Sequence, residues 1–197
     1  MLTNSISEKE YDRLIRRLEH YYSTRNTLLT FSFTAVLAVL GVTLKVELDM
    51  IGSCICLLPF LLIIPFTARI SYYRLASAHV NSFLRTFSKQ NMQFEIGAGK
   101  VTENQIVSYR LVAWLINHEM FLLGIATSCV FYLKYIPLLQ SVNIWNGMLL
   151  VIPVALNVVV FFISDATFSY TRMMIKFLKQ WEEYKESIES IENESDE

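Results

Sequence analysis

Four long stretches without a charged residue alternate with charged segments along the 197-residue chain. They cover residues 27–44, 50–68, 120–133 and 145–164 and are 18, 19, 14 and 20 residues long. A helix rises about 1.5 Å per residue, so 20 residues cross the roughly 30 Å hydrocarbon core of a bilayer. The third stretch is short, but Lys134 can extend its ammonium group toward the outer surface while the span continues to residue 139. The pattern predicts four transmembrane helices.

The charged segments that flank these stretches carry apolar residues at alternating spacings of three and four. This spacing is typical of helices that pack through one stripe. After the fourth span the stripe comprises Tyr170, Met174, Phe177, Trp181, Tyr184, Ile188 and Ile191. Similar stripes stand next to the other spans: Tyr11, Leu14, Leu18 and Tyr21; Tyr73, Ser77, Val80, Leu84 and Phe87; Ile106, Tyr109, Ala113, Ile116 and Met120. We therefore expect the helices to continue beyond the membrane and to form a cytoplasmic helical bundle.

Two heptapeptides, ARISYYR at 68–74 and ATFSYTR at 166–172, share the pattern A-x-x-S-Y-x-R, and each follows a predicted span. The expected fold is an all-α integral membrane protein built from two tandem helix–span–span–helix units. The expected segments are an amphipathic cytoplasmic helix at 1–26, a two-span unit with its cytoplasmic helix at 27–95, a glycine-containing linker at 96–100, a second unit at 101–181 and an acidic tail at 182–197.

Composition and charge support a membrane protein with a defined orientation. Hydrophobic residues make up 53% of the chain, and the mean hydropathy is +0.38. A soluble bundle would need four buried helices without a single charge, so we favour membrane insertion. All of the 17 Lys and Arg except Lys45 and Lys134 lie before the first span, between the second and third, or after the fourth. The positive-inside rule then places both termini and the middle segment in the cytoplasm.

Small and hydroxyl-bearing residues recur along one side of the first span. Its members are Thr27, Thr30, Thr34, Ala38 and Gly41, hereafter the small-residue face. Such a face allows close helix packing within or between chains, and several copies around an axis would also suit a narrow pore. In the fourth span, Asn157 is the deepest strong polar group, and we expect it to bond across a helix interface rather than line a pore.

Charged and apolar residues at the cytoplasmic side indicate the partners. Arg25, Arg69, Arg74, Arg172 and Lys176 are expected to lie at the inner interface, where they would attract anionic lipid headgroups. The stripe of Phe177, Trp181, Tyr184, Ile188 and Ile191 is a candidate docking seam for a cytosolic protein. The tail from residue 182 onward has eight acidic residues and one Lys, which is most simply a solvated helix end.

No motif for catalysis, phosphate binding or metal binding occurs in the sequence. We expect no enzymatic activity, no cofactor and no direct nucleic-acid binding. One alternative is open, because Arg74 and His79 form an R-x-x-x-x-H pattern that resembles the signature of HEPN ribonucleases. That resemblance implies a nuclease site at a helix end.

The stretches YYSTRNTLLTFSFTAVLAVLGV, which enters the first pair of spans, and SYYRLASAHVNSFL, which leaves it, resemble the SLATT class of bacterial conflict-system membrane effectors. The four-span size is also similar to the membrane subunit of Kiwa-type phage-defence systems. These resemblances imply a homo-oligomer in the bacterial inner membrane that acts as a defence or stress effector or sensor, with a pore formed or gated through the small-residue face. The alternative is a membrane anchor that recruits a cytosolic partner through its C-terminal helix.

Overall fold

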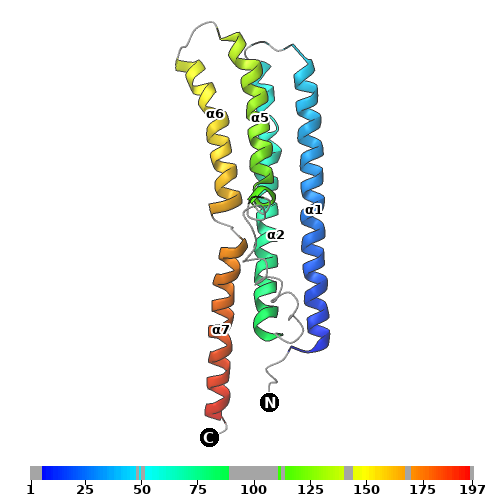
Figure 1. The fold of residues 1–197 in the computed structure, drawn as a ribbon, viewed down its shortest axis with the longest axis vertical. Helices are drawn as coiled ribbons and strands as arrows, with labels where there is room; N and C mark the ends of the chain where they lie inside the picture. Colours follow the sequence, from blue (N-terminus) through cyan, green and yellow to red (C-terminus); the bar gives the residue numbers. More distant parts are fainter. Residues whose placement is uncertain are drawn as a thin grey trace. The chain divides into compact units, whose positions relative to one another are not determined.

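The computed structural model describes residues 6–47, 49, 52–88, 111, 114–139, 144–166 and 170–195, and no strand occurs among them. The helices are drawn in Figure 1. They are α1 (Glu8–Lys45), the 3₁₀ turns η1 (Gly52–Leu57), α2 (Phe60–Phe87), α5 (Glu119–Tyr135), the 3₁₀ turn η2 (Ile136–Leu138), α6 (Ile144–Phe161), the π turn η3 (Phe162–Ala166) and α7 (Tyr170–Ser195). The predicted linker at 96–100 and most of the helix predicted before the third span lie outside the described residues.

Four segments are long and apolar enough to cross a membrane: Glu8–Lys45, Gly52–Phe87, Glu119–Leu138 and Ile144–Ser164. This result confirms the four predicted spans, and the chain is a multi-pass membrane protein. The helical form follows from the solvent, because hydrocarbon cannot hydrogen bond with the backbone and every N–H and C=O must find its partner inside the protein.

Hydroxyl groups within the spans also find partners on their own helices. Ser32 donates to the Leu28 carbonyl at 2.6 Å, Thr67 to the Ile63 carbonyl at 2.6 Å and Thr127 to the Leu123 carbonyl at 2.9 Å. Bonding to the carbonyl one turn back satisfies the hydroxyl without a second helix. These polar residues can therefore sit in apolar spans at little cost.

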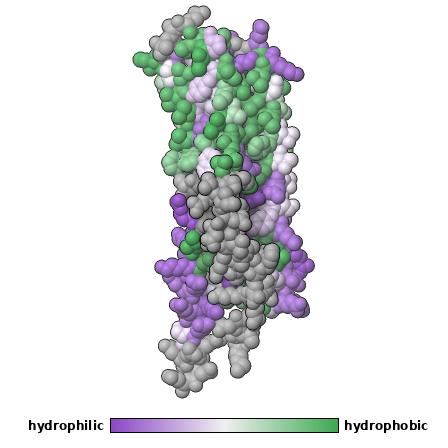
Figure 2. Space-filling view, in the orientation of Figure 1, coloured by the Kyte–Doolittle hydropathy of each residue, from purple (hydrophilic) through white to green (hydrophobic). Residues whose placement is uncertain are grey.

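The chain divides into two compact units. Unit 2 comprises residues 25–72 and 111–167 and holds the four apolar helical segments. Its core takes buried side chains from all four segments, including Val36 of α1, Ile63 of α2, Leu123 of α5 and Val160 of α6. The visible surface of these segments is mostly hydrophobic in Figure 2, which fits contact with lipid tails.

Unit 1 comprises residues 1–24, 73–110 and 168–197. Leu18 of α1 packs with Val80 and Leu84 of α2, and the Asn81 amide of α2 donates to the Tyr22 hydroxyl of α1 at 3.0 Å. The described helices of this unit thus use the apolar stripes identified in the sequence. Each compact unit collects segments from both halves of the chain, and the tandem repeat stays a prediction.

Two helix boundaries differ from the expected ones. The second span was expected to be helical from residue 50, but Gly52–Leu57 forms 3₁₀ turns and the α-helix begins only at Phe60, after Pro59. The fourth span was expected to run into the cytoplasmic helix without interruption. Instead, α6 ends at Phe161, a π turn follows at Phe162–Ala166, and α7 begins at Tyr170. By contrast, α2 leaves the second span without a break and continues as one α-helix to Phe87.

The π turn has a partner on α2. The Ser71 hydroxyl donates to the carbonyl of Ile163, inside the turn, at 3.1 Å. A π turn disturbs the regular i to i−4 ladder, so a hydroxyl from a neighbouring helix can take a carbonyl that the ladder leaves available. The serine of the A-x-x-S-Y-x-R pattern at 68–74 therefore links α2 to the turn that follows α6 through this hydrogen bond.

Lys134, which was expected to extend toward the outer surface, finds its partners at the end of α1 that adjoins the predicted outer connection. Its ammonium group donates to the carbonyls of Leu44 and Val46, at 2.9 and 3.1 Å. These carbonyls stand at the C-terminal end of α1, where helix carbonyls lack intrahelical partners and carry partial negative charge. Lys134 therefore caps α1 from α5 and joins these two helices in unit 2.

We predict that Lys134→Met lowers the free energy of unfolding by about 1–3 kcal/mol, because two charge-assisted hydrogen bonds are lost. Lys134→Arg keeps the charge and the donors and should lose less than half as much. Unfolding by titration with sodium dodecyl sulfate in micelles measures both changes. Equal losses in the two variants would show that the cap contributes nothing specific.

Candidate functional site

The small-residue face points out of unit 2. Its residues (Thr27, Thr30, Thr34, Ala38 and Gly41) are all exposed. The buried positions of the same helix are Leu29, Ser32, Val36, Leu40 and Thr43. At 100° per residue, the two sets lie about half a turn apart around the helix axis. Among the described residues, the face is therefore not part of the core of unit 2, and it is open to contact with lipid or with another molecule, or to a pore.

The surroundings of this face make it a shallow strip between larger side chains. A Cβ added at Gly41 would meet nothing within 4 Å. The strip is flanked by exposed Phe31 and Val42 on one side and exposed Leu37 on the other. Thr34 donates to the Thr30 carbonyl at 2.9 Å, so its hydroxyl needs no outside partner. The strip can thus receive a helix of a second copy at close range.

Asn157 lies at the contact between α6 and α5, as expected for an interface residue. It is 9% exposed, and its Nδ2 donates to Ser128 Oγ at 2.6 Å and to the Pro153 carbonyl at 2.9 Å. A longer bond of 3.4 Å reaches the Gly124 carbonyl. The buried Oδ1 has no hydrogen-bond partner among the described residues. It lies so close to Gly124 that a Cβ there would be 2.5 Å away.

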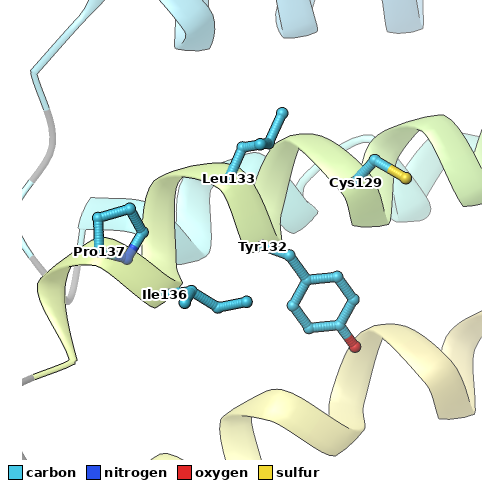
Figure 3. Close-up of a pocket in the computed structure, with 5 residues that line it drawn as sticks. All are labelled: Cys129, Tyr132, Leu133, Ile136 and Pro137. Atoms are coloured by element: carbon cyan, nitrogen blue, oxygen red, sulfur yellow. The ribbon is translucent and has the colours of Figure 1, made fainter.

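Two tyrosines continue this polar contact toward the outer end of α5. Tyr132 donates to the Leu150 carbonyl at 2.7 Å, and buried Tyr135 donates to Asn146 Oδ1 at 3.2 Å. Figure 3 shows the Tyr132 hydroxyl turned toward α6. With Ser128–Asn157, these bonds recur about once per helical turn, so the α5–α6 pair is joined along its length by polar contacts.

An open surface pocket of about 550 Å³ lies on the same part of α5. Its lining residues are Cys129, Tyr132, Leu133, Ile136 and Pro137, labelled in Figure 3. The lining offers no charged side chain, and the Tyr132 hydroxyl is engaged with α6. The lining is apolar apart from the Cys129 thiol and the Tyr132 hydroxyl, so the pocket suits an apolar occupant. In the described part of the chain, no three His, Cys, Asp or Glu residues gather closely enough to hold a metal ion.

The predicted basic residues do not form one uniform set. Arg69, Arg172 and Lys176 are exposed, and Arg69 lies over the Tyr72 ring at 6.0 Å from its centroid. Arg25 is half-buried and donates to Asn26 Oδ1 at 3.2 Å. Arg74 is only 6% exposed, so it differs from the expectation of a headgroup-facing residue.

The stripe of α7 is divided between two environments. In unit 1, the Trp181 ring stacks on His79 of α2 at 5.2 Å and meets Phe83 edge-on at 4.9 Å, while Phe177 lies 4.8 Å from the His79 ring. Tyr184 and Ile191, further along the stripe, are 53% and 66% exposed, and Ile188 is half-buried. At Phe177 and Trp181, the candidate docking seam is therefore occupied by the chain itself.

Arg74 and His79 do not meet in one site within the chain. Five residues apart on a continuous helix, they point about 140° away from each other. His79 stacks on α7, whereas Arg74 is buried. The two side chains of the R-x-x-x-x-H pattern therefore do not converge on a common reacting atom in this arrangement.

Several residues that organise unit 2 had no distinctive sequence pattern. Lys134 and Ser71 bond to backbone carbonyls on other helices, and His118 stacks between Trp114 and Phe161 at 4.5 and 5.6 Å. The one available indication was Lys134, a single charge at the end of an apolar span. The others depend on which helices become neighbours, which periodicity alone does not predict.

Comparison with protein-family models, with curated proteins and with solved structures found no match for this chain.

We predict that Gly124→Ala destabilises the α5–α6 contact by about 1–3 kcal/mol, because the new Cβ would overlap Asn157 Oδ1 and crowd Phe60. Gly147→Ala is the matched control, since a Cβ at Gly147 meets nothing within 4 Å and alanine favours helix. Denaturation in micelles should show a loss for the first variant and none for the second. Indistinguishable stabilities would contradict the close approach at Gly124.

A second prediction concerns pH. Burial against α7 lowers the pKa of His79 below its ordinary value of 6.5, and the positive charge of Arg17 lowers this pKa further. Unfolded or undocked chains then bind the proton more readily, so the contact is fully stable above about pH 6.5 and weakens as the pH falls through that value.

Trp181 emission in a Trp114→Phe/Trp145→Phe background reports this contact. We expect a red shift on acidification from pH 7.5 to 5.5, because Trp181 becomes wetter. His79→Phe keeps an aromatic ring but cannot be protonated, so its emission should stay unchanged. A shift of the same size in both proteins would assign the pH response to another group.

Proposed function

We propose that the protein is a homo-oligomeric membrane effector or sensor whose copies meet through the small-residue face of α1 and form or gate a pore there. The observation that carries this proposal is the position of the face, which is exposed and opposite the buried side of α1. Small residues allow helix backbones to approach closely in lipid, where van der Waals packing rather than the hydrophobic effect drives association.

The orientation proposed for the chain has both termini in the cytoplasm of a bacterial cell. The distribution of Lys and Arg supports it, and the described basic residues Arg69, Arg172 and Lys176 are exposed, as contact with anionic headgroups or water requires. The likeness to SLATT-type effectors and to the Kiwa-type subunit supports a role in defence or stress.

Oligomerisation is better supported than a scaffold role. The scaffold would use the whole seam from Phe177 to Ile191 as a free docking helix, but Phe177 and Trp181 pack against His79 and Phe83 of the same chain. The small-residue face, by contrast, is exposed in the described part of the chain.

Replacing Ala38 with Leu should fill the small-residue face and separate the copies. We expect the wild-type protein to form a discrete oligomer in native mass spectrometry, and Ala38→Leu to raise the dissociation constant at least about tenfold, equal to about 1.4 kcal/mol. Ion flux from liposomes should decrease in Ala38→Leu as the fraction of oligomer decreases. Val42→Leu is the control, because Val42 is a large side chain, 64% exposed, beside the face.

A monomeric wild-type protein would overturn the proposal. An oligomer that survives Ala38→Leu unchanged would place the contact elsewhere. If liposomes that contain the intact oligomer show no ion flux, the association between copies would stand and the pore would be ruled out.

A further inference from the structure

The π turn at Phe162–Ala166 has no local cause in its own sequence. Its five residues, FISDA, include neither glycine nor proline, the residues that most often break a helix. A π turn holds one residue more than the α-helical turn that the same chain could form, and such turns occur frequently at functional sites. The turn therefore depends on contacts with other helices.

One such contact comes from α2. The Ser71 side chain is 1% exposed, and its hydroxyl donates to the Ile163 carbonyl at 3.1 Å. Thr67, one turn earlier and equally buried, instead donates to the Ile63 carbonyl of its own helix at 2.6 Å. Ser71 has the same kind of acceptor within reach, because the Thr67 carbonyl lies four residues back on α2. The Ser71 hydroxyl thus has two alternative acceptors.

The end of α6 that precedes the turn is fixed by aromatic contacts. The Phe161 ring stacks on His118, with 5.6 Å between the ring centroids, and meets Phe121 edge-on at 5.2 Å. The buried Ser164 hydroxyl donates to the Phe161 carbonyl at 3.0 Å. A change in the turn therefore leaves the end of α6 in place and moves the chain that follows.

We propose that Ser71 is a latch with two positions. It holds the π turn while its hydroxyl bonds to the Ile163 carbonyl, and it releases the turn when the hydroxyl moves to the Thr67 carbonyl. In the released state, the Ile163 carbonyl accepts the N–H four residues further on, and the turn becomes α-helical. The hydroxyl and the carbonyl both have a partner in each state, so the two states differ by little free energy, as a switch requires.

Release of the latch changes the direction in which the chain leaves the last span. Removing one residue from the turn rotates the following chain by about 100° relative to α6, the angle of one residue in an α-helix. This chain leads to α7, which begins at Tyr170. The latch therefore couples a rotation of α7 to the hydrogen bond between Ser71 and Ile163. It goes beyond the proposed function, since it requires neither the oligomer nor the pore.

Distances between spin labels on α6 and α7, measured by double electron–electron resonance in nanodiscs, test the latch. One label is placed at Val158, which is 47% exposed, and the other at Ile175 or Lys176. The last two positions are exposed and face about 100° apart, so a rotation of α7 changes at least one distance. Dilution with unlabelled protein removes distances between copies. Alanine replaces the native cysteines Cys54, Cys56 and Cys129.

Ser71→Ala removes the latch, and Thr67→Val is the matched control because it removes an equally buried hydroxyl that bonds within α2. We expect Ser71→Ala to shift the main distance by up to about 8 Å, the displacement of a label on a helix surface rotated by about 100°. Thr67→Val should keep the wild-type distances. Deletion of Phe162, which shortens the turn by one residue, should reproduce the distances of Ser71→Ala.

Unchanged distances in Ser71→Ala would overturn the latch. Equal shifts in Thr67→Val would overturn it as well, because the response would then follow the loss of any buried hydroxyl. A broad distribution without a new maximum would show that the turn unfolds instead of switching, and a deletion variant with different distances would contradict the α-helical released state. None of these results changes the proposed oligomer or pore, which native mass spectrometry and ion flux test separately.

Discussion

Hydrogen bonding without water is the constraint on which the rest of unit 2 depends. In hydrocarbon, a polar group that lacks a partner inside the protein costs several kcal/mol. The spans satisfy this constraint in two ways. Hydroxyls such as Ser32 and Thr67 bond back to their own helices, and Tyr132, Lys134 and Asn157 bond to neighbouring ones. The second group determines which helices lie side by side.

The α5–α6 contact illustrates how a glycine and an amide depend on each other. Asn157 reaches Ser128 because Gly124 has no side chain in its way. Its Oδ1 lies against the same glycine and has no hydrogen-bond partner in the described part of the chain. The net stabilisation from this amide is therefore smaller than its three donor contacts suggest, and its main effect is to fix the register of the two helices.

The helical class and the four spans could be predicted from the sequence because charge-free stretches of bilayer length are rare in other proteins. The interface position of Asn157 was also expected from its depth. The sequence did not indicate the π turn at Phe162–Ala166 or the 3₁₀ start at Gly52, since these depend on local backbone adjustment within uniformly apolar stretches. The burial of Arg74 and the pairing of Trp181 with His79 required knowledge of which helices become neighbours.

The bond from the Thr34 hydroxyl to the Thr30 carbonyl would bear on permeation through the proposed pore. A threonine whose hydroxyl bonds to its own helix presents its methyl group. The surface that a hydrated ion meets there would resemble valine in polarity more than serine. A ring of such faces would hold back water by dewetting, as hydrophobic constrictions do in channels. Conduction would then begin with the rotation of hydroxyls toward the axis, and the resting pore would be dry.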